Sequence, residues 1–117
     1  MVATKIRGSI LCTSSSTTLI GGLAPHVYTL TKEAIVGLVK SATCELGERG
    51  IHVNCISPDG VPFDMLVASY GKIIRDHMTA KKVSEIVALG GSLLQGRSAT
   101  GNDNALESLF LASEEGG

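Results

Sequence analysis

The sequence contains few aromatic side chains and no tryptophan. Aromatic residues make up 3% of its 117 residues, whereas apolar residues as a whole make up 44%. The apolar content is therefore mostly Val, Ile, Leu and Ala, the residues of helices packed against a sheet. This composition favours an α/β layer protein over a β-sandwich, and the length suits about one domain.

The sequence also lacks an excess of charge of either sign. It has 10 basic and 11 acidic residues, for a formal net charge of -1, so nothing favours nucleic acid or an anionic membrane as a partner. It has no apolar run of about 18 residues, the length that a membrane-spanning helix needs, and residues 1–9 lack the apolar core of a signal peptide. We therefore predict a soluble, cytoplasmic protein that binds neither membranes nor nucleic acids.

The sequence has three cysteines, and their pattern argues against disulfides. Cys12, Cys44 and Cys55 are an odd number at wide spacings, each among apolar neighbours. We predict reduced, buried thiols of an intracellular protein. The three histidines are too dispersed to form a ligand pattern with the cysteines, so we predict no metal site.

Two strands joined by a long helix are predicted in the first half of the sequence. Short apolar runs at residues 9–13 and 51–56 suit buried strands, and residues 28–47 show helical periodicity. The apolar stripe of this predicted helix consists of Ile35, Leu38, Val39, Ala42 and Leu46. The order strand, helix, strand is that of a βαβ unit, so we expect the two strands to be parallel with a right-handed crossover.

The second half of the sequence is predicted to be mainly helical. Short helices are expected within residues 65–78 and 81–94, after a loop that begins at Asp59, and an amphipathic helix within residues 103–117. That last helix carries Ala105, Leu106, Leu109 and Phe110. Because open sheets usually hold about four to six strands, either strands are hidden or the chain is part of something larger.

A tyrosine and a lysine four residues apart, Tyr28 and Lys32, begin the long helix. Residues at this spacing share a helix face, so the ammonium can lie near the phenol and favour its ionised form. Such a tyrosine can act as an acid or base near neutral pH, although the same pair arises by chance on solvated helices. Ser15 follows the first strand at its carboxyl end, where α/β sheets gather ligands, and its hydroxyl can donate to an oxygen that Tyr28 protonates. We interpret Ser14 and Ser16 as parts of a hydroxyl-rich turn.

Three segments carry a family resemblance: "GSILCTSS", "HVYTLTKEAIVGLVKSATCELGERGIHVNCISPDGV" and "LFLASEE", in that order. Together they resemble the second half of a short-chain dehydrogenase/reductase, most of all the plant group that includes secoisolariciresinol and xanthoxin dehydrogenases. The resemblance covers residues 8–61 densely and residues 96–115 more loosely. It implies an α/β fold with a Rossmann-like doubly wound parallel sheet, and reversible hydride transfer between NAD(P) and an alcohol or ketone.

The resemblance also implies roles for particular residues. Tyr28 would be the general acid/base, Lys32 would favour its ionised form and hydrogen-bond the nicotinamide ribose, and Ser15 would orient the substrate oxygen. Three residues match the segment whose backbone contacts the nicotinamide, although a plain proline–glycine turn is the alternative there: Pro58, Gly60 and Val61. The implied cofactor is NAD, with NADP as the alternative. Helices of this kind commonly pair between subunits, which implies a homo-oligomer or association with a full-length relative.

The sequence departs from the family pattern at both ends. It lacks the Gly-rich turn that receives the cofactor's pyrophosphate and the family's last strand, and an Asp64 carboxylate near that pyrophosphate would repel it. We therefore expect residues 1–117 to form one partial Rossmann-like domain, the catalytic half, whose activity needs more than these residues. One alternative is a non-catalytic fragment that acts as an interaction module with a full-length relative. Another is an unrelated small α/β domain with a chance motif.

Overall fold

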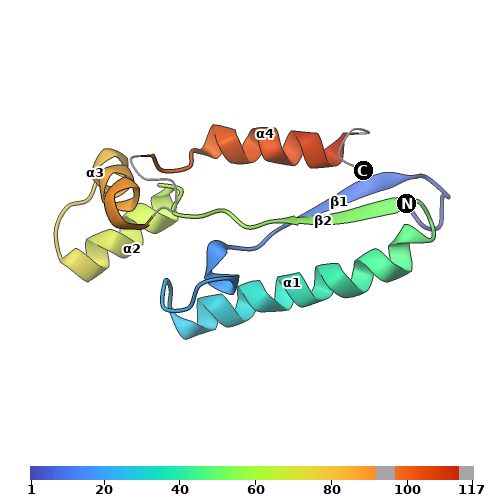
Figure 1. Ribbon diagram of the computed structural model, residues 1–117, viewed down its shortest axis with the longest axis horizontal. Helices are drawn as coiled ribbons and strands as arrows, with labels where there is room; N and C mark the ends of the chain where they lie inside the picture. Colours follow the sequence, from blue (N-terminus) through green and yellow to red (C-terminus); the bar gives the residue numbers. More distant parts are fainter. Residues whose placement is uncertain (92–96, 114–117) are drawn as a thin grey trace. The chain divides into compact units, whose positions relative to one another are not determined.

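The computed structural model describes residues 1–91 and 97–113, which divide into two compact units. The first, here called the strand unit, consists of Met1–Ser57 and Ala105–Gly117, and the second, the helical unit, consists of Pro58–Asn104. Figure 1 follows the chain through both, and each is described by itself. This division does not test whether residues 1–117 form one partial domain, which stays a prediction.

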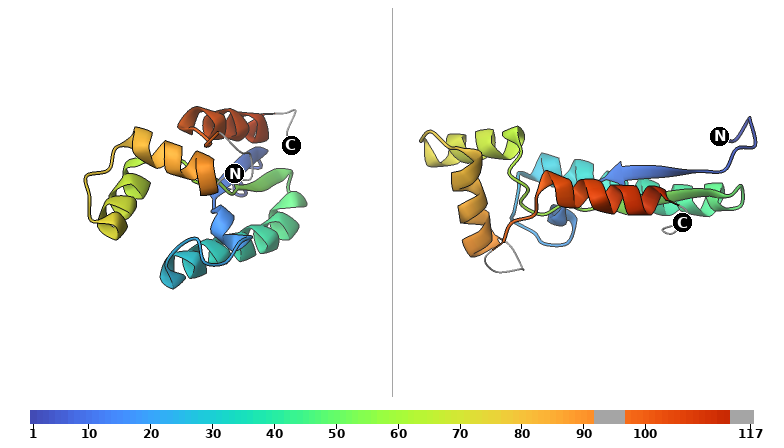
Figure 2. Two further views of the ribbon diagram at one scale, coloured as in Figure 1. Left: turned by 60° about the vertical axis from the view of Figure 1, so that its left-hand side comes forward. Right: turned by 90° about the horizontal axis from the view of Figure 1, so that it is seen from above.

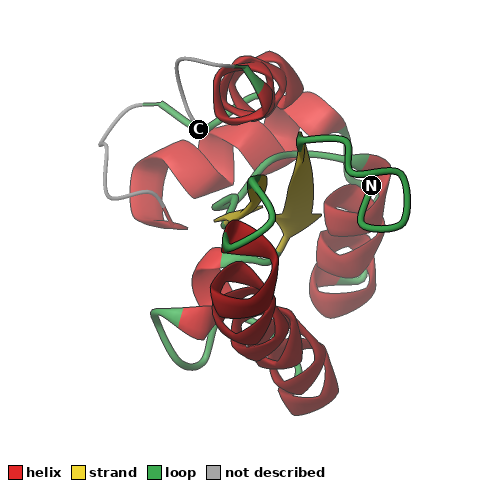
Figure 3. Cartoon of the chain, turned by 90° about the vertical axis from the view of Figure 1, so that its right-hand side faces the viewer, coloured by secondary structure: helices red, strands yellow, loops and turns green. Residues whose placement is uncertain are grey.

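The strand unit contains the predicted βαβ arrangement. Strands β1 (Gly8–Thr13) and β2 (Ile51–Ile56) pair in parallel, and helix α1 (His26–Gly47) connects them. Pro25 is the N-cap residue of α1, and the helix begins at His26, two residues before the predicted start. In the described part of the chain β1 and β2 are the only strands (Figure 3). The predicted strands and their parallel pairing are therefore confirmed.

The core of the strand unit lies between the strands and one side of α1. Ile51 and Val53 of β2 are buried there, and the Thr43 hydroxyl of α1 donates a hydrogen bond to the Val53 carbonyl at 3.0 Å. Ile56 is also buried, and alternation along the strand places it on the opposite face of the sheet. Four residues of the predicted stripe are half-buried: Ile35, Val39, Ala42 and Leu46. The fifth, Leu38, is 62% exposed, so its assignment to the packed stripe is wrong. Two strands cover only a narrow strip of a helix, and Leu38, which lies about 60° round the helix from Ile35, is beyond that strip.

The three cysteines are free, as predicted, but none of them is fully buried. Cys44 is exposed on α1, and Cys12 and Cys55 are half-buried on neighbouring strands. Apolar neighbours in the sequence do not determine how many layers cover a side chain in the fold. The prediction of buried thiols is therefore wrong, because the two-stranded sheet leaves its flanks open.

Helix α4 (Gly101–Ala112) lies along the side of the strands away from α1 over its residues from Ala105 onward (Figures 1 and 2). The Ser9 hydroxyl of β1 donates a hydrogen bond to the Leu111 carbonyl at 3.2 Å. The predicted helix is confirmed, with residues 114–117 outside the described part. Its apolar residues are mostly in solvent, since Leu106 is 58%, Leu109 68% and Phe110 53% exposed.

The helical unit contains α2 (Asp64–Ile74), α3 (Ala80–Ile86) and the short helix η2 (Val87–Gly91). These elements confirm the two predicted helices, which end earlier than expected, and predicted positions 92–94 lie outside the described residues. Val83 and Val87 are buried, and the Thr79 hydroxyl caps α3 by accepting from the Lys82 backbone N–H at 3.3 Å. None of the helices in the described part of the chain combines enough length with enough apolar character to cross a membrane.

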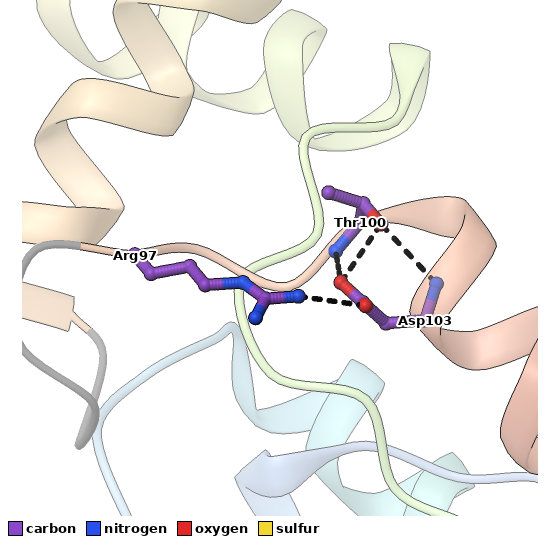
Figure 4. Close-up of polar contacts among 3 residues, drawn as sticks. All are labelled: Arg97, Thr100 and Asp103. Carbon is purple, nitrogen blue, oxygen red and sulfur yellow. Dashed lines mark hydrogen bonds and ion pairs between the residues drawn. The ribbon is translucent and has the colours of Figure 1, made fainter.

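The start of α4 carries a capping box that the sequence analysis missed. The Thr100 hydroxyl accepts from the Asp103 backbone N–H at 3.2 Å, and the Asp103 carboxylate accepts from the Thr100 backbone N–H at 2.9 Å (Figure 4). Arg97 forms an ion pair with the same carboxylate at 2.8 Å. The pattern T-x-x-D before an apolar helical run is the signal that would have revealed it.

Acid is expected to weaken this cap. Hydrogen bonds from Thr100, and secondly from Arg97, lower the pKa of Asp103 below its ordinary value of 3.8. A carboxyl whose pKa is depressed by folding stabilises the chain above its unfolded pKa, and this contribution is lost as the pH falls from about 3.8 through the folded pKa. Asp103→Asn should therefore unfold at lower urea concentration than the parent chain at pH 7, with the gap closing on acidification towards pH 3. A gap that is the same at both pH values would contradict the assignment.

Candidate active site

The candidate site begins where β1 ends. The Ser14 backbone N–H donates to the Ile56 carbonyl at 2.8 Å, which continues the pairing with β2 by one residue. Ser15 then has extended backbone, with φ -164, and caps the short helix η1 (Ser16–Thr18) by accepting from the Thr17 backbone N–H at 3.3 Å. Because this bond uses an oxygen lone pair, the Ser15 hydroxyl keeps its proton for donation. Ser15 is buried at 8% exposure.

Tyr28 and Lys32 lie together on the first turns of α1. The Lys32 ammonium is 5.6 Å from the centroid of the Tyr28 ring, and both residues are half-buried. The same ammonium donates a hydrogen bond to the Thr13 carbonyl, the last of β1, at 2.9 Å. The structure thus brings the lysine next to the tyrosine, as the four-residue spacing predicts, and ties it to the strand end that precedes Ser15.

Ser14 has a larger part in this arrangement than sequence reasoning gave it. Its side chain is 2% exposed, and its hydroxyl donates to the backbone carbonyl of Lys32 at 3.0 Å. Lys32 is therefore held at both ends, by its carbonyl on Ser14 and by its ammonium on Thr13. The interpretation of Ser14 as an ordinary turn residue missed this contact, because partners 18 positions apart leave no local signal.

Pro58, Gly60 and Val61 belong to the helical unit. Gly60 has φ +53, and a Cβ added there would lie 2.4 Å from Cγ1 of Val87. Val61 is buried, and its carbonyl accepts from the Phe63 backbone N–H at 2.8 Å. The structure thus brings Tyr28 and Lys32 together with the strand end that carries Ser15. Pro58, Gly60 and Val61, in contrast, belong to the helical unit. Their role stays a prediction.

Two open depressions in the strand unit lie away from this group of residues. One is lined by Met1, Arg49 and Ile51 among others, and the second by Gly50, His52 and their neighbours, so both lie at the amino ends of the strands. Since Ser15 and Lys32 lie at the carboxyl end, neither depression is part of the candidate site. The carboxyl end also carries Thr17, whose buried hydroxyl has no hydrogen-bond partner among the described residues.

The sequence matches one family over its full length. The family described as Enoyl-(Acyl carrier protein) reductase matches residues 1–117. Short-chain dehydrogenase reductase ATA1 of Arabidopsis thaliana is 54% identical over 109 residues, which are 92% of this chain and 40% of that protein. (+)-Borneol dehydrogenase 2 of Salvia officinalis is 40% identical over 109 residues, which are 93% of this chain and 38% of that protein. The chain thus spans about 40% of the length of the curated relatives it matches.

The fold also resembles solved structures. Carveol dehydrogenase from Mycobacterium avium, crystallised in complex with NAD, superposes with a TM-score of 0.81 at 24% sequence identity. The superposition covers 97% of this chain and 42% of that one. This likeness confirms the predicted fold class, a partial Rossmann-like α/β fold.

Proposed function

Because the chain belongs to the short-chain dehydrogenase/reductase family, we propose that it supplies the catalytic half of an oxidoreductase. The proposed reaction is reversible hydride transfer between NAD(P) and a small alcohol or ketone. Tyr28 is the general acid/base, Lys32 favours the ionised phenol and Ser15 orients the substrate oxygen. The observation that carries the proposal is the Lys32 ammonium, which lies beside the Tyr28 ring and on the last carbonyl of β1.

The described residues fit the nicotinamide end of the cofactor. An ammonium has three hydrogens, of which the Thr13 carbonyl takes one, so Lys32 keeps donors for the hydroxyls of a ribose. The Thr17 hydroxyl is a further polar group at this end of the sheet. The sequence offers no Gly-rich turn for the phosphates, so the fit is to one half of the cofactor. When bound, NAD(P) supplies or accepts the hydride.

The chain's own residues handle the proton. In the reducing direction the Tyr28 hydroxyl donates its proton to the carbonyl oxygen while the Ser15 hydroxyl donates a hydrogen bond to the same atom. The phenolate that forms lies beside the Lys32 ammonium, and attraction between the two charges stabilises it. In the oxidising direction the phenolate takes the proton of the alcohol. Because Lys32 is fixed at both ends, its charge needs no rearrangement during the step.

Binding of half a cofactor tests the proposal directly. We expect residues 1–117 to bind NADH and reduced nicotinamide mononucleotide with similar Kd values on the order of 1 mM, because the partners that we propose among the described residues are for the nicotinamide end. Lys32→Met should weaken both by about 10- to 100-fold, since a charge-assisted hydrogen bond contributes about 1.5–3 kcal/mol. The measurement is an NMR titration, with Lys40→Met as the control, because Lys40 is an exposed lysine of the same helix. A folded sample that binds neither compound contradicts the proposal.

Self-association is the second part of the proposal. Val27 is 73%, Leu30 70% and Leu38 62% exposed, so one side of α1 presents apolar side chains to solvent. We propose that this side packs against a second copy or a full-length relative, because contiguous apolar surface favours association. An interaction module without catalysis would use the same surface. The cytoplasmic location and the alcohol or ketone substrate stay predictions.

A further inference from the structure

Cys12 of β1 and Cys55 of β2 are directly opposite each other in the parallel ladder. Both thiols are free and half-buried. We propose that they form a redox-active dithiol site, which small disulfides such as oxidised glutathione convert into one disulfide across the two strands. This proposal concerns the thiols alone and does not depend on the oxidoreductase activity.

The two side chains lie on the same face of the sheet. Alternation along a strand places Ser9 and Leu11 on one face of β1, and Ile10 and Cys12 on the other. The Ser9 hydroxyl bonds to α4, so Cys12 lies on the face towards α1. Partners in a parallel ladder point to the same side, which places Cys55 on that face as well.

The spacing of paired strands allows the bond and makes it reversible. Neighbouring strands lie about 4.7–4.9 Å apart, within the roughly 4.4–6.8 Å between Cα atoms that disulfides span. Side chains that project in parallel keep their Cβ atoms further apart than the mean of about 3.8 Å in disulfides, so closure strains the bond. Strained disulfides have more oxidising potentials and are reduced readily. The pair is therefore expected to cycle between dithiol and disulfide.

The reaction proceeds by two exchanges. The thiolate of one cysteine attacks a sulfur of oxidised glutathione, which forms a mixed disulfide and releases one glutathione thiolate. The second cysteine then attacks the protein sulfur of the mixed disulfide and releases the second glutathione. The protein loses two S–H bonds and gains one S–S bond, and oxidised glutathione is reduced to two thiols that carry the two protons.

The bond would form next to both backbone anchors of the candidate site. Cys12 precedes Thr13, whose carbonyl holds the Lys32 ammonium. Cys55 precedes Ile56, whose carbonyl accepts from the Ser14 backbone N–H. Oxidation is therefore expected to shift the NMR resonances of Lys32 and Ser14 as well as those of the cysteines.

The test uses the Cys44→Ser chain, so that the exposed third thiol cannot react. After treatment of the folded chain with oxidised glutathione, we expect its mass to fall by two hydrogen atoms. A digest without reductant should join the peptides of Cys12 and Cys55, and dithiothreitol should reverse the change. Adding Cys12→Ser or Cys55→Ser should instead stop the reaction at one bound glutathione.

Three results would overturn the proposal. In the first, Cys12 and Cys55 stay unmodified under conditions that glutathionylate Cys44 of the parent chain. In the second, a stable mixed disulfide with glutathione accumulates although both cysteines are present. In the third, the cross-link forms only in urea. The last would show that folding prevents the bond. The readout is the mass of the protein in the absence of NADH. Failure of the dithiol proposal therefore does not bear on the proposed function, and failure of the proposed function does not bear on the dithiol proposal.

Discussion

Replacing Tyr28 by phenylalanine is expected to lower kcat for alcohol oxidation about 10²- to 10⁴-fold, because the substitution removes the group that we propose to exchange a proton with the substrate oxygen. KM should change little, since the ring stays in place and the Lys32 ammonium can still lie over it at 5.6 Å from its centroid. The measurement is the steady-state rate of NADH formation by an active protein that includes residues 1–117, compared with and without the substitution.

Tyr70 is the matched control for this substitution. It is the other tyrosine of the chain, lies on α2 and is half-buried like Tyr28. Tyr70→Phe removes one hydroxyl in the same way, and it should leave kcat within about twofold. Circular dichroism should show the parent helix content in both variants. Equal rates for Tyr28→Phe and the parent protein would remove Tyr28 from the proposed mechanism.

Gly60→Ala is expected to lower the free energy of unfolding of the helical unit by about 2–5 kcal/mol. Its φ of +53 is unfavourable for a residue with a Cβ, by about 1–2 kcal/mol. The new Cβ would also lie 2.4 Å from Cγ1 of buried Val87, and overpacking of this kind costs about 1–3 kcal/mol. Urea unfolding followed by circular dichroism measures the change.

Two further variants separate the causes of that loss. Gly37→Ala makes the same chemical change within α1, where a Cβ would meet no atom within 4 Å beyond its chain neighbours and the local helix backbone, and it should stabilise the chain by about 0.5–1 kcal/mol. Gly60→Ala should lower the free energy of unfolding less in a chain that already carries Val87→Ala than in the parent chain, because Val87→Ala removes the methyl groups that the new Cβ would overlap. A Gly60→Ala chain as stable as its parent would show that this turn is not held as described.

The sequence predicts the elements of this fold well because their signals are local. Alternating apolar residues mark β2, the helical stripe marks α1, and Tyr28 and Lys32 share a face by spacing alone. The capping box of Thr100 and Asp103 was equally local and could have been found.

What the sequence could not reveal depends on neighbours that only the fold supplies. Leu38 fits the stripe of α1 by period, yet the two strands do not reach it. The cysteines were assigned to the core from their flanking residues, whereas their exposure depends on how many layers cover the sheet. Ser14 gave no sign of its bond to Lys32, because this contact forms only when the strand end and the helix meet.

The double attachment of Lys32 links the site to the cooperativity of folding. Its carbonyl and its ammonium are bonded to consecutive residues at the end of β1, so α1 cannot separate from the strand while the lysine keeps its place. Amide protons near Lys32 should then exchange with deuterium in the same opening event as those of the paired strands, as one foldon. On this view the proposed catalytic group has no assembly step of its own: it forms when the βαβ unit folds and is lost when that unit opens.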